Sequence, residues 1–179
     1  EIIRNTPFLA QLFFIYFGLP SLGIRLAPEE GALIALVINS GAYATEIMRA
    51  GIESIHKGQI EAGYSLGLSG IQVFKHVILM PALKKIYPAL ASQFILIMLN
   101  SSIISVISAQ ELTYQANYLQ SRSFRSFEVY FTVTFIYLAL SYFFRALFGI
   151  SYNKLFGRKR ARKSSLLSLA KREAQEVVP

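Results

Sequence analysis

The 179-residue sequence contains no cysteine and no aspartate, and it has only two histidines, His56 and His76. The absence of cysteine excludes disulfide bonds, cysteine-ligated zinc and thiol nucleophiles. Without aspartate, and with so little histidine, the chain has few groups for hydrolytic or metal chemistry. Charged residues are scarce as well, at 16% of the chain against about a quarter in an ordinary soluble domain. We therefore predict no catalytic residues, no metal site and no cofactor bound by this chain.

Hydrophobic residues are abundant, at 54% of the chain, and the mean hydropathy is +0.45. They gather in four runs, each close to the length of about 20 residues with which a helix crosses a bilayer. Backbone groups in lipid must be satisfied within their own segment, so each run is predicted to be a helix. The predicted fold class is an all-α integral membrane protein, a bundle of about four visible transmembrane helices. The runs cover residues 7–24, 31–48, 87–109 and 127–150.

Positive charge is concentrated on one side of this predicted bundle. The net charge is +8, and residues 49–85 carry five cations against two glutamates. Lysine and arginine favour cytoplasmic segments, so this loop, the tail and the C-terminus are predicted to be cytoplasmic. The tail, residues 151–179, is predicted to be disordered or to form a short surface helix near 165–176, with anionic lipid contact as a second role. Its basic residues are Lys154, Arg158, Lys159, Arg160, Arg162, Lys163, Lys171 and Arg172.

The stretch EAGYSLGLSGIQVFKHVILMP, residues 61–81, lies between two apolar runs but is too polar to cross a membrane. Apolar residues recur at helical spacing around its start, at Ile60, Tyr64 and Leu68. Gly67 is placed to end this helix in the left-handed conformation that glycine adopts readily. Ser69 and Gln72 then have the spacing of a capping box, which begins a second helix. The pattern predicts a helix, a glycine corner and a helix at the cytoplasmic surface.

The second helix of this loop has an apolar stripe, with Lys75 and His76 on its remaining surface. The stripe consists of Ile71, Phe74, Val77 and Ile78. In the first helix, Ala62 and Gly63 are small enough to let another backbone approach closely. The spacing alone fits two interpretations equally, a docking element and a stiff connector that contains glycines.

The same stretch resembles the cytoplasmic EAA loop of ATP-binding-cassette (ABC) importer permeases. The pattern of that loop is Glu-Ala-Ala, three residues, Gly, nine residues and then Ile-x-Leu-Pro. Glu61, Ala62 and Gly67 match this pattern, Gly63 replaces the second alanine, and Val77 and Leu79 fit its end. The end of the pattern is less regular, because Met80 occupies the proline position and Pro81 follows one residue later.

The flanking segments resemble the polar amino acid branch of these permeases. IRNTPFLAQLFFIYFGLP is similar to its Arg-Gly-Thr-Pro-Leu-Leu-x-Gln-Leu-Phe-Phe run, and NSGAYATEIMRAGIESIHKGQIEAG to its Gly-Ala-Tyr-x-x-Glu segment. LNSSIISVISAQEL follows the Lys-Asp-Thr-Ser-Leu region loosely, with Asn100 in the lysine position. The resemblance extends over about residues 2–148. The family generally has five spans, so we expect residues 1–150 to be its transmembrane domain without the first span.

The resemblance implies a permease subunit, in the bacterial inner membrane, of an ATP-driven importer for polar amino acids or their derivatives. ATP would be used by a separate cytoplasmic ATPase dimer, which receives the loop at residues 51–85. The other implied partners are a second permease subunit, an extracytoplasmic substrate-binding protein and membrane lipid. A basic or amide amino acid, an opine or another derivative remains open as substrate, as does a homodimer or heterodimer. The implied coupling residues are Glu61, Ala62, Gly63, Gly67, Leu68 and Ser69.

The substrate path requires polar groups inside the spans. An amino acid needs donors for its carboxylate and acceptors for its ammonium group, and amides and hydroxyls supply both. Polar residues inside a membrane are functional hypotheses, although many of them only join helices. The candidates are Asn39, Ser40, Thr45, Asn100, Ser101 and Ser102, and Gln93 is a further candidate.

The last run is rich in aromatic residues, which are predicted to form a lipid-facing and interfacial surface. This aromatic stripe consists of Tyr130, Phe131, Phe135, Tyr137, Tyr142, Phe143 and Phe144.

Two other classes of protein fit parts of the sequence. A passive channel or an ion-coupled carrier for a small polar solute is the first, but a carrier usually has an acid or base at mid-span. Here Glu46, Glu128 and Arg145 lie near span ends, and Glu46 is predicted to pair with Arg49 three residues later. A membrane-anchored nucleic-acid or lipid-binding protein is the second. Nucleic-acid binding needs aromatics among the cations, and Phe156 is the last aromatic residue, so no nucleic-acid partner is predicted.

Overall fold

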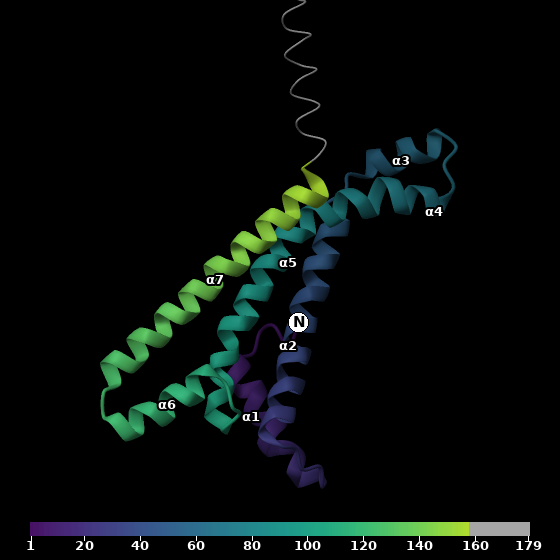
Figure 1. Ribbon diagram of the computed structural model, residues 1–179. Coiled ribbons are helices and arrows are strands. Elements are labelled where there is room, and N and C mark those ends of the chain that lie inside the picture. Colours follow the sequence, from purple (N-terminus) through teal and green to yellow (C-terminus); the bar gives the residue numbers. More distant parts are fainter. Residues whose placement is uncertain (158–179) are drawn as a thin grey trace, which may run out of the picture.

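The computed structural model describes residues 1–157, which form helices joined by short turns, with no strand in that part of the chain (Figure 1). The predicted all-α class is thus confirmed. The predicted tail, residues 151–179, begins inside a helix, because residues 151–156 form the end of the last helix, and residues 158–179 lie outside the described residues. The elements are α1 (Phe8–Gly18), η1 (Leu19–Leu22), α2 (Pro28–Glu53), α3 (Lys57–Ser65), α4 (Gly70–Gln72), η2 (Val73–Leu79), α5 (Met80–Asn100), η3 (Ser101–Ile107), α6 (Leu112–Ser123) and α7 (Ser126–Phe156).

Three helical stretches are long and apolar enough to cross a membrane: α2, the continuous helix Gly70–Ile107, and α7. The first predicted run, residues 7–24, contains a shorter apolar helix. The helix there is limited to Phe8–Leu22, because Pro7 precedes α1 and the left-handed Gly23 ends η1. At the rise of α- and 3₁₀-helices it extends about 24 Å, less than the hydrocarbon core of about 30 Å.

The helix Gly70–Ile107 contains both the second predicted helix of the polar loop, which we call the polar arm, and the third predicted span. We expected that span to begin at residue 87, but 17 residues of helix precede it. Pro81 has no N–H, and its ring crowds the carbonyl four residues earlier. The preceding segment, η2, is π-helical, with wider turns that accommodate the proline without ending the helix. The polar arm and the apolar span therefore form one continuous rod.

The core of the bundle lies between α1, α2 and η3. Leu12, Ala32 and Ile107 are buried there, and small residues on α2 bring the helices close together. A second cluster, formed by Ile55, Ala82 and Ile86, lies at the opposite end of α2. The small core leaves most of the apolar surface of the bundle exposed, as expected of a protein surrounded by lipid.

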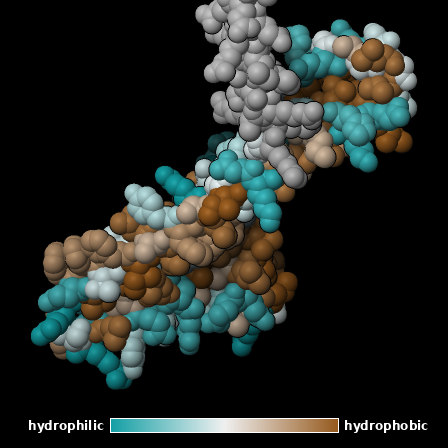
Figure 2. Space-filling model, turned by 45° about the horizontal axis from the view of Figure 1, so that its top comes forward, coloured by the Kyte–Doolittle hydropathy of each residue, from teal (hydrophilic) through white to brown (hydrophobic). Residues whose placement is uncertain are grey.

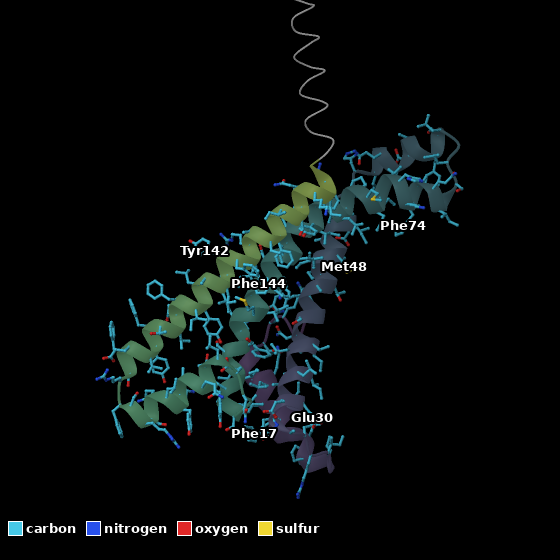
Figure 3. The ribbon with its side chains drawn as sticks, viewed as in Figure 1. Phe17, Glu30, Met48, Phe74, Tyr142 and Phe144 are labelled. Atoms are coloured by element: carbon cyan, nitrogen blue, oxygen red, sulfur yellow. The ribbon has the colours of Figure 1, made fainter. Side chains whose placement is uncertain are left out.

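Helix α7 has no buried residue and ends at Phe156, six residues beyond the predicted end of its span. Most of its predicted aromatic stripe is exposed. Two members depart from the prediction. Phe144 packs against Phe94 of α5, with 5.1 Å between ring centroids, and the Tyr137 hydroxyl donates to the Glu111 carboxylate at 2.9 Å. Figure 3 shows Tyr142 on the outer side of α7 and Phe144 on the side that faces α5.

Candidate functional site

Helices α3 and α4 with η2, residues 57–79, form a hairpin that stands away from the bundle beyond the ends of α2 and α5 (Figure 1). We call this element the projecting hairpin. It has the predicted sequence of helix, glycine corner and helix. Gly67 has a φ of +77°, and its N–H donates to the Tyr64 carbonyl at 2.9 Å. The Leu68 N–H donates to the Gly63 carbonyl at 3.2 Å, which completes a Schellman motif.

The second arm of the hairpin begins with the predicted capping box. The Ser69 N–H donates to Oε1 of Gln72 at 2.9 Å, and the Ser69 hydroxyl lies 3.1 Å from the same oxygen. The first arm begins at His56, four residues before Ile60. The Gly58 N–H donates to Nδ1 of His56 at 3.1 Å, so His56 caps α3, and Glu61 lies in the middle of the helix.

The two arms touch through Gly63. A Cβ at this position would lie 3.3 Å from side-chain carbons of both Val73 and Val77. Val73 is the most buried side chain of the hairpin, at 1% exposure. The predicted apolar stripe of the second arm is therefore rotated, because Val73 packs inward while Ile71 and Phe74 are exposed. Gly63, predicted to contact a partner, instead packs inside the hairpin.

The outer surface of the hairpin carries four large apolar residues, which we call the tip patch: Tyr64, Leu66, Ile71 and Phe74. Leu66 and Ile71 are each 81% exposed. Figure 2 shows apolar surface among polar surface on this lobe, and Figure 3 labels Phe74 there. Clustered exposed apolar groups on a polar element are typical of a protein interface.

The predicted coupling residues are divided between the surface and the interior of the hairpin. Leu68 is half-buried, and Gly63 is buried. The exposed members are Glu61, Ala62, Gly67 and Ser69.

The hairpin joins the bundle where the end of α2 meets α5, a contact that we call the root and that is formed by Gly51, Ser54, Lys85 and Ile86. A Cβ on Gly51 of α2 would overlap Cγ1 of Ile86 on α5, so the two helices are in direct contact at this glycine. The Lys85 ammonium group donates to the Ser54 carbonyl at 2.9 Å and thus caps the C-terminal end of α2. Residues more than 30 positions apart make these contacts, and the sequence pattern does not single them out.

The predicted ion pair between Glu46 and Arg49 is confirmed. Arg49 also pairs with Glu53, at 2.6 Å. Arg4 in the N-terminal segment lies 3.2 Å from Glu46, a contact that was not predicted. These charges form a line along α2 toward the root of the hairpin.

Among the substrate-path candidates, Asn39 lies in the core at 7% exposure. Its amide donates to Oε1 of Gln11 on α1 at 2.9 Å. Gln11 in turn donates to the Ile3 carbonyl at 2.6 Å and to the Thr6 hydroxyl at 2.8 Å. This network ties the N-terminal segment to α1 and α2. Gln11 was not among the predicted residues, although an amide within an apolar run was a usable signal.

The other candidates lie on separate elements. Ser101 and Ser102, where α5 passes into η3, donate to their own helix at 2.7 and 2.8 Å. Thr45 donates to the Gly41 carbonyl at 2.8 Å. Ser40 on α2 and Asn100 at the end of α5 are half-buried. Thr45 also lines a polar hollow of about 500 Å³ with Glu1, Arg4, Ala42, Glu46 and Arg49.

Comparison with known proteins identifies related chains. The model of the family described as binding-protein-dependent transport system inner membrane component matches residues 1–157. The probable glutamine ABC transporter permease protein GlnM of Bacillus subtilis is 42% identical over 141 residues, which cover 79% of this chain and 65% of the relative. The glutamine transport system permease protein GlnP of Escherichia coli is 41% identical over 143 residues, with the same coverage of both chains.

A more distant relative is the L-cystine transport system permease protein TcyL of Bacillus subtilis, 32% identical over 162 residues, 87% of this chain and 68% of the relative. A crystal structure of an amino acid ABC transporter with histidines matches 86% of this chain and 72% of its own, with a TM-score of 0.80 and 40% identity. The chain thus spans 65% of the length of the two glutamine permease relatives.

Proposed function

The chain belongs to the family of binding-protein-dependent transport system inner membrane components, and from this we propose that it is the transmembrane permease subunit of an ATP-driven importer for polar amino acids or their derivatives. A separate cytoplasmic ATPase dimer hydrolyses ATP. A substrate-binding protein delivers the substrate from the other side, and a second permease subunit, the same or a sister chain, completes the path. The relatives named as glutamine and cystine permeases support this substrate class.

The projecting hairpin is the observation that supports the proposal most strongly. Its first arm lies outside the three helices long and apolar enough to span a membrane, and its second arm exposes Lys75 and His76, so lipid does not account for the exposed tip patch. A protein surface that receives Leu66 and Ile71 would remove them from water. We assign this role to the ATPase subunit, with the hairpin and the C-terminus on the cytoplasmic side.

The root and the continuous helix support a mechanical role for the hairpin. Its second arm continues without a break into α5, and its first arm follows α2 after a three-residue turn. The Gly51–Ile86 contact and the Lys85–Ser54 bond join the two helices where the hairpin begins. When ATP closes the ATPase dimer, each hairpin is displaced, and α2 and α5 move with it. The permease then alternates between inward-facing and outward-facing states.

The substrate path lies between the spans of the two permease subunits. Asn39, Ser40, Thr45, Asn100, Ser101 and Ser102 remain our candidates for lining it. The serine and threonine hydroxyls that donate to their own helix keep lone pairs able to accept from an ammonium group. The amides of Asn39 and Asn100 supply donors for a carboxylate.

The proposal is tested by reconstituting the permease in liposomes with its ATPase and binding protein. Uptake and ATP hydrolysis are measured with glutamine, histidine, arginine, cystine and an opine. We expect one ligand to stimulate both. Ligand flux without ATP would instead identify a channel or an ion-coupled carrier.

Two substitutions of Gly67 distinguish a loss of ATPase docking from a loss of the turn at the tip of the hairpin. Gly67→Arg adds bulk and charge beside the tip patch, and we expect it to abolish ligand-stimulated hydrolysis while membrane insertion persists. Gly67→Asn is the matched control, because asparagine tolerates the left-handed conformation and no atom lies within 4 Å of the added Cβ. Normal uptake by the Gly67→Arg variant would contradict the docking role.

A further inference from the structure

A hollow of about 300 Å³ lies between α5 and α7, in a part of the bundle to which the proposed transport mechanism assigns no role. On α7, Arg145, Gly149 and Asn153 line it at intervals of four residues, which places them on one helix face. On α5, Pro88, Ser92 and Ile95 line the opposite wall.

Packed aromatic rings hold this hollow open. Tyr87 of α5 contacts Tyr152 of α7, with 5.7 Å between centroids, and Phe94 contacts Phe148 at 5.3 Å. Between these two contacts, Gly149 presents no side chain, and nothing lies within 4 Å of a Cβ built on it. The helices are thus spaced by rings on both sides of an open glycine, and they do not close over it.

The charge of the hollow comes from Arg145. Its side chain is exposed, and none of the ion pairs within residues 1–157 involves it. At the α-helical rise, Arg145 lies about 17 Å and Gly149 about 10 Å before the C-terminal end of α7. That end carries Lys154 in its last turn. Arg145, predicted near a span end, thus lies further inside α7 than expected, and a cation within an apolar span is costly unless an anion or water reaches it.

We propose that this hollow binds an anionic phospholipid, with the phosphate group over Gly149 and Arg145 as its counter-ion. The Tyr152 hydroxyl and the Asn153 amide, which also line the hollow, supply hydrogen-bond donors. The apolar walls at Ile95 and Phe148 suit the acyl chains. Basic pockets between transmembrane helices near a membrane surface bind lipid head groups on this principle. A free phosphate ion would have to leave water to reach the same position, whereas a lipid carries its phosphate along the bilayer surface.

The absence of tryptophan from the chain allows a direct test. Tyr152→Trp places a single fluorophore in the hollow and replaces the hydroxyl donor by the indole N–H donor. Phe131→Trp places the same reporter near the other end of α7, on an exposed position away from the hollow. Each full chain is reconstituted in vesicles, and quenching by brominated phosphatidylglycerol is compared with quenching by brominated phosphatidylcholine.

We expect the Trp reporter of Tyr152→Trp to favour the anionic lipid about fivefold, the factor that one basic residue contributes near an anionic membrane surface. The reporter of Phe131→Trp should show a ratio near one. Adding Arg145→Gln to Tyr152→Trp should return its ratio to near one, whereas Arg25→Gln, in a loop far from the hollow along the chain, should leave it unchanged. Equal quenching by both lipids in Tyr152→Trp, or a preference that survives Arg145→Gln, would overturn the proposal.

A second pair of variants tests the shape of the hollow. Gly149→Leu fills the open space without backbone strain and should remove the preference for the anionic lipid. Gly41→Leu is the matched control, because a Cβ there also meets no atom within 4 Å, and it should keep the preference. Loss of the preference in millimolar inorganic phosphate would identify a free-anion site and contradict the proposal. Weak quenching by both lipids would mean that protein covers the hollow, which also contradicts it.

Discussion

The projecting hairpin and α7 both expose large apolar side chains, but they do so in different surroundings. Helix α7 is apolar along its whole length and has no buried residue, so its exposed rings suit lipid. The hairpin mixes polar and apolar residues, with exposed Lys75 and His76 beside Ile71. Exposure alone therefore does not distinguish a lipid-facing surface from a protein-binding surface. The polarity of the surrounding element distinguishes them.

The largest expected effect is on membrane insertion. Phe143→Asp places a charge on the exposed face near the middle of α7, which should disfavour insertion by about 3 kcal/mol, a factor of more than 100. The same change in the hairpin, Phe74→Asp, should leave insertion unchanged because we propose that Phe74 contacts the ATPase and not lipid. An insertion assay with engineered glycosylation sites measures both. A loss of insertion in Phe74→Asp would place the hairpin in the membrane.

The next effect concerns binding to the ATPase. Ile71→Glu places a charge in the tip patch and should weaken binding about 30-fold, as for a substituted hot-spot residue. Lys75→Gln, on an exposed residue of the same arm, is the control and should change binding little. Titration of the reconstituted permease with the ATPase measures the difference. Equal affinities for the two variants would exclude the tip patch as the docking surface.

A smaller effect is expected at the root. Gly51→Ala forces a methyl group into Ile86 and should destabilise the helix contact by about 1–3 kcal/mol. Adding Ile86→Ala to Gly51→Ala removes the overlapping atoms and should recover part of the loss. Thermal unfolding in detergent measures the series. Additive losses in the double variant would show that the two residues do not contact each other.

The smallest effect is expected in the buried amide network. A double-mutant cycle of Asn39→Ala and Gln11→Ala should give a coupling energy of about 0.6 kcal/mol, typical of hydrogen bonds between membrane helices. Thermal unfolding again measures it. A coupling energy of zero would mean that the observed bond does not stabilise the packing of α1 on α2.

The features that could be predicted from the sequence are those with local signals. Gly67 and the Ser69–Gln72 spacing act within one or two turns, and the structure contains both features as predicted. Hydropathy located the centres of α2 and α7 for the same reason, and its third run covers the second half of α5 and η3. Their ends were less predictable. The third run was expected to begin at residue 87, yet the π-helical turns before Pro81 keep the helix continuous from Gly70.

The features that could not be predicted depend on contacts between distant residues. Gly51 and Ile86 are 35 positions apart, and Asn39 and Gln11 are 28 apart, so no local pattern relates them. Val73 was missed because the rotation of the second arm depends on how Gly63 packs against it. The helix in the first run is shorter than the run of apolar residues, because Pro7 and Gly23 limit it. Residue type alone likewise does not tell which hydroxyls line a path and which bond to their own helix.

The central claim, that the projecting hairpin is where the ATPase docks, is tested most directly by cross-linking. The chain contains no cysteine, so Leu66→Cys in the tip patch and Phe131→Cys on α7 each introduce a single reactive group on an exposed position. In the assembled transporter, with accessible cysteines on the ATPase, we expect Leu66→Cys to cross-link to that subunit and Phe131→Cys to remain unlinked. Cross-linking from Phe131→Cys, or none from Leu66→Cys in a complex that still transports, would contradict the account.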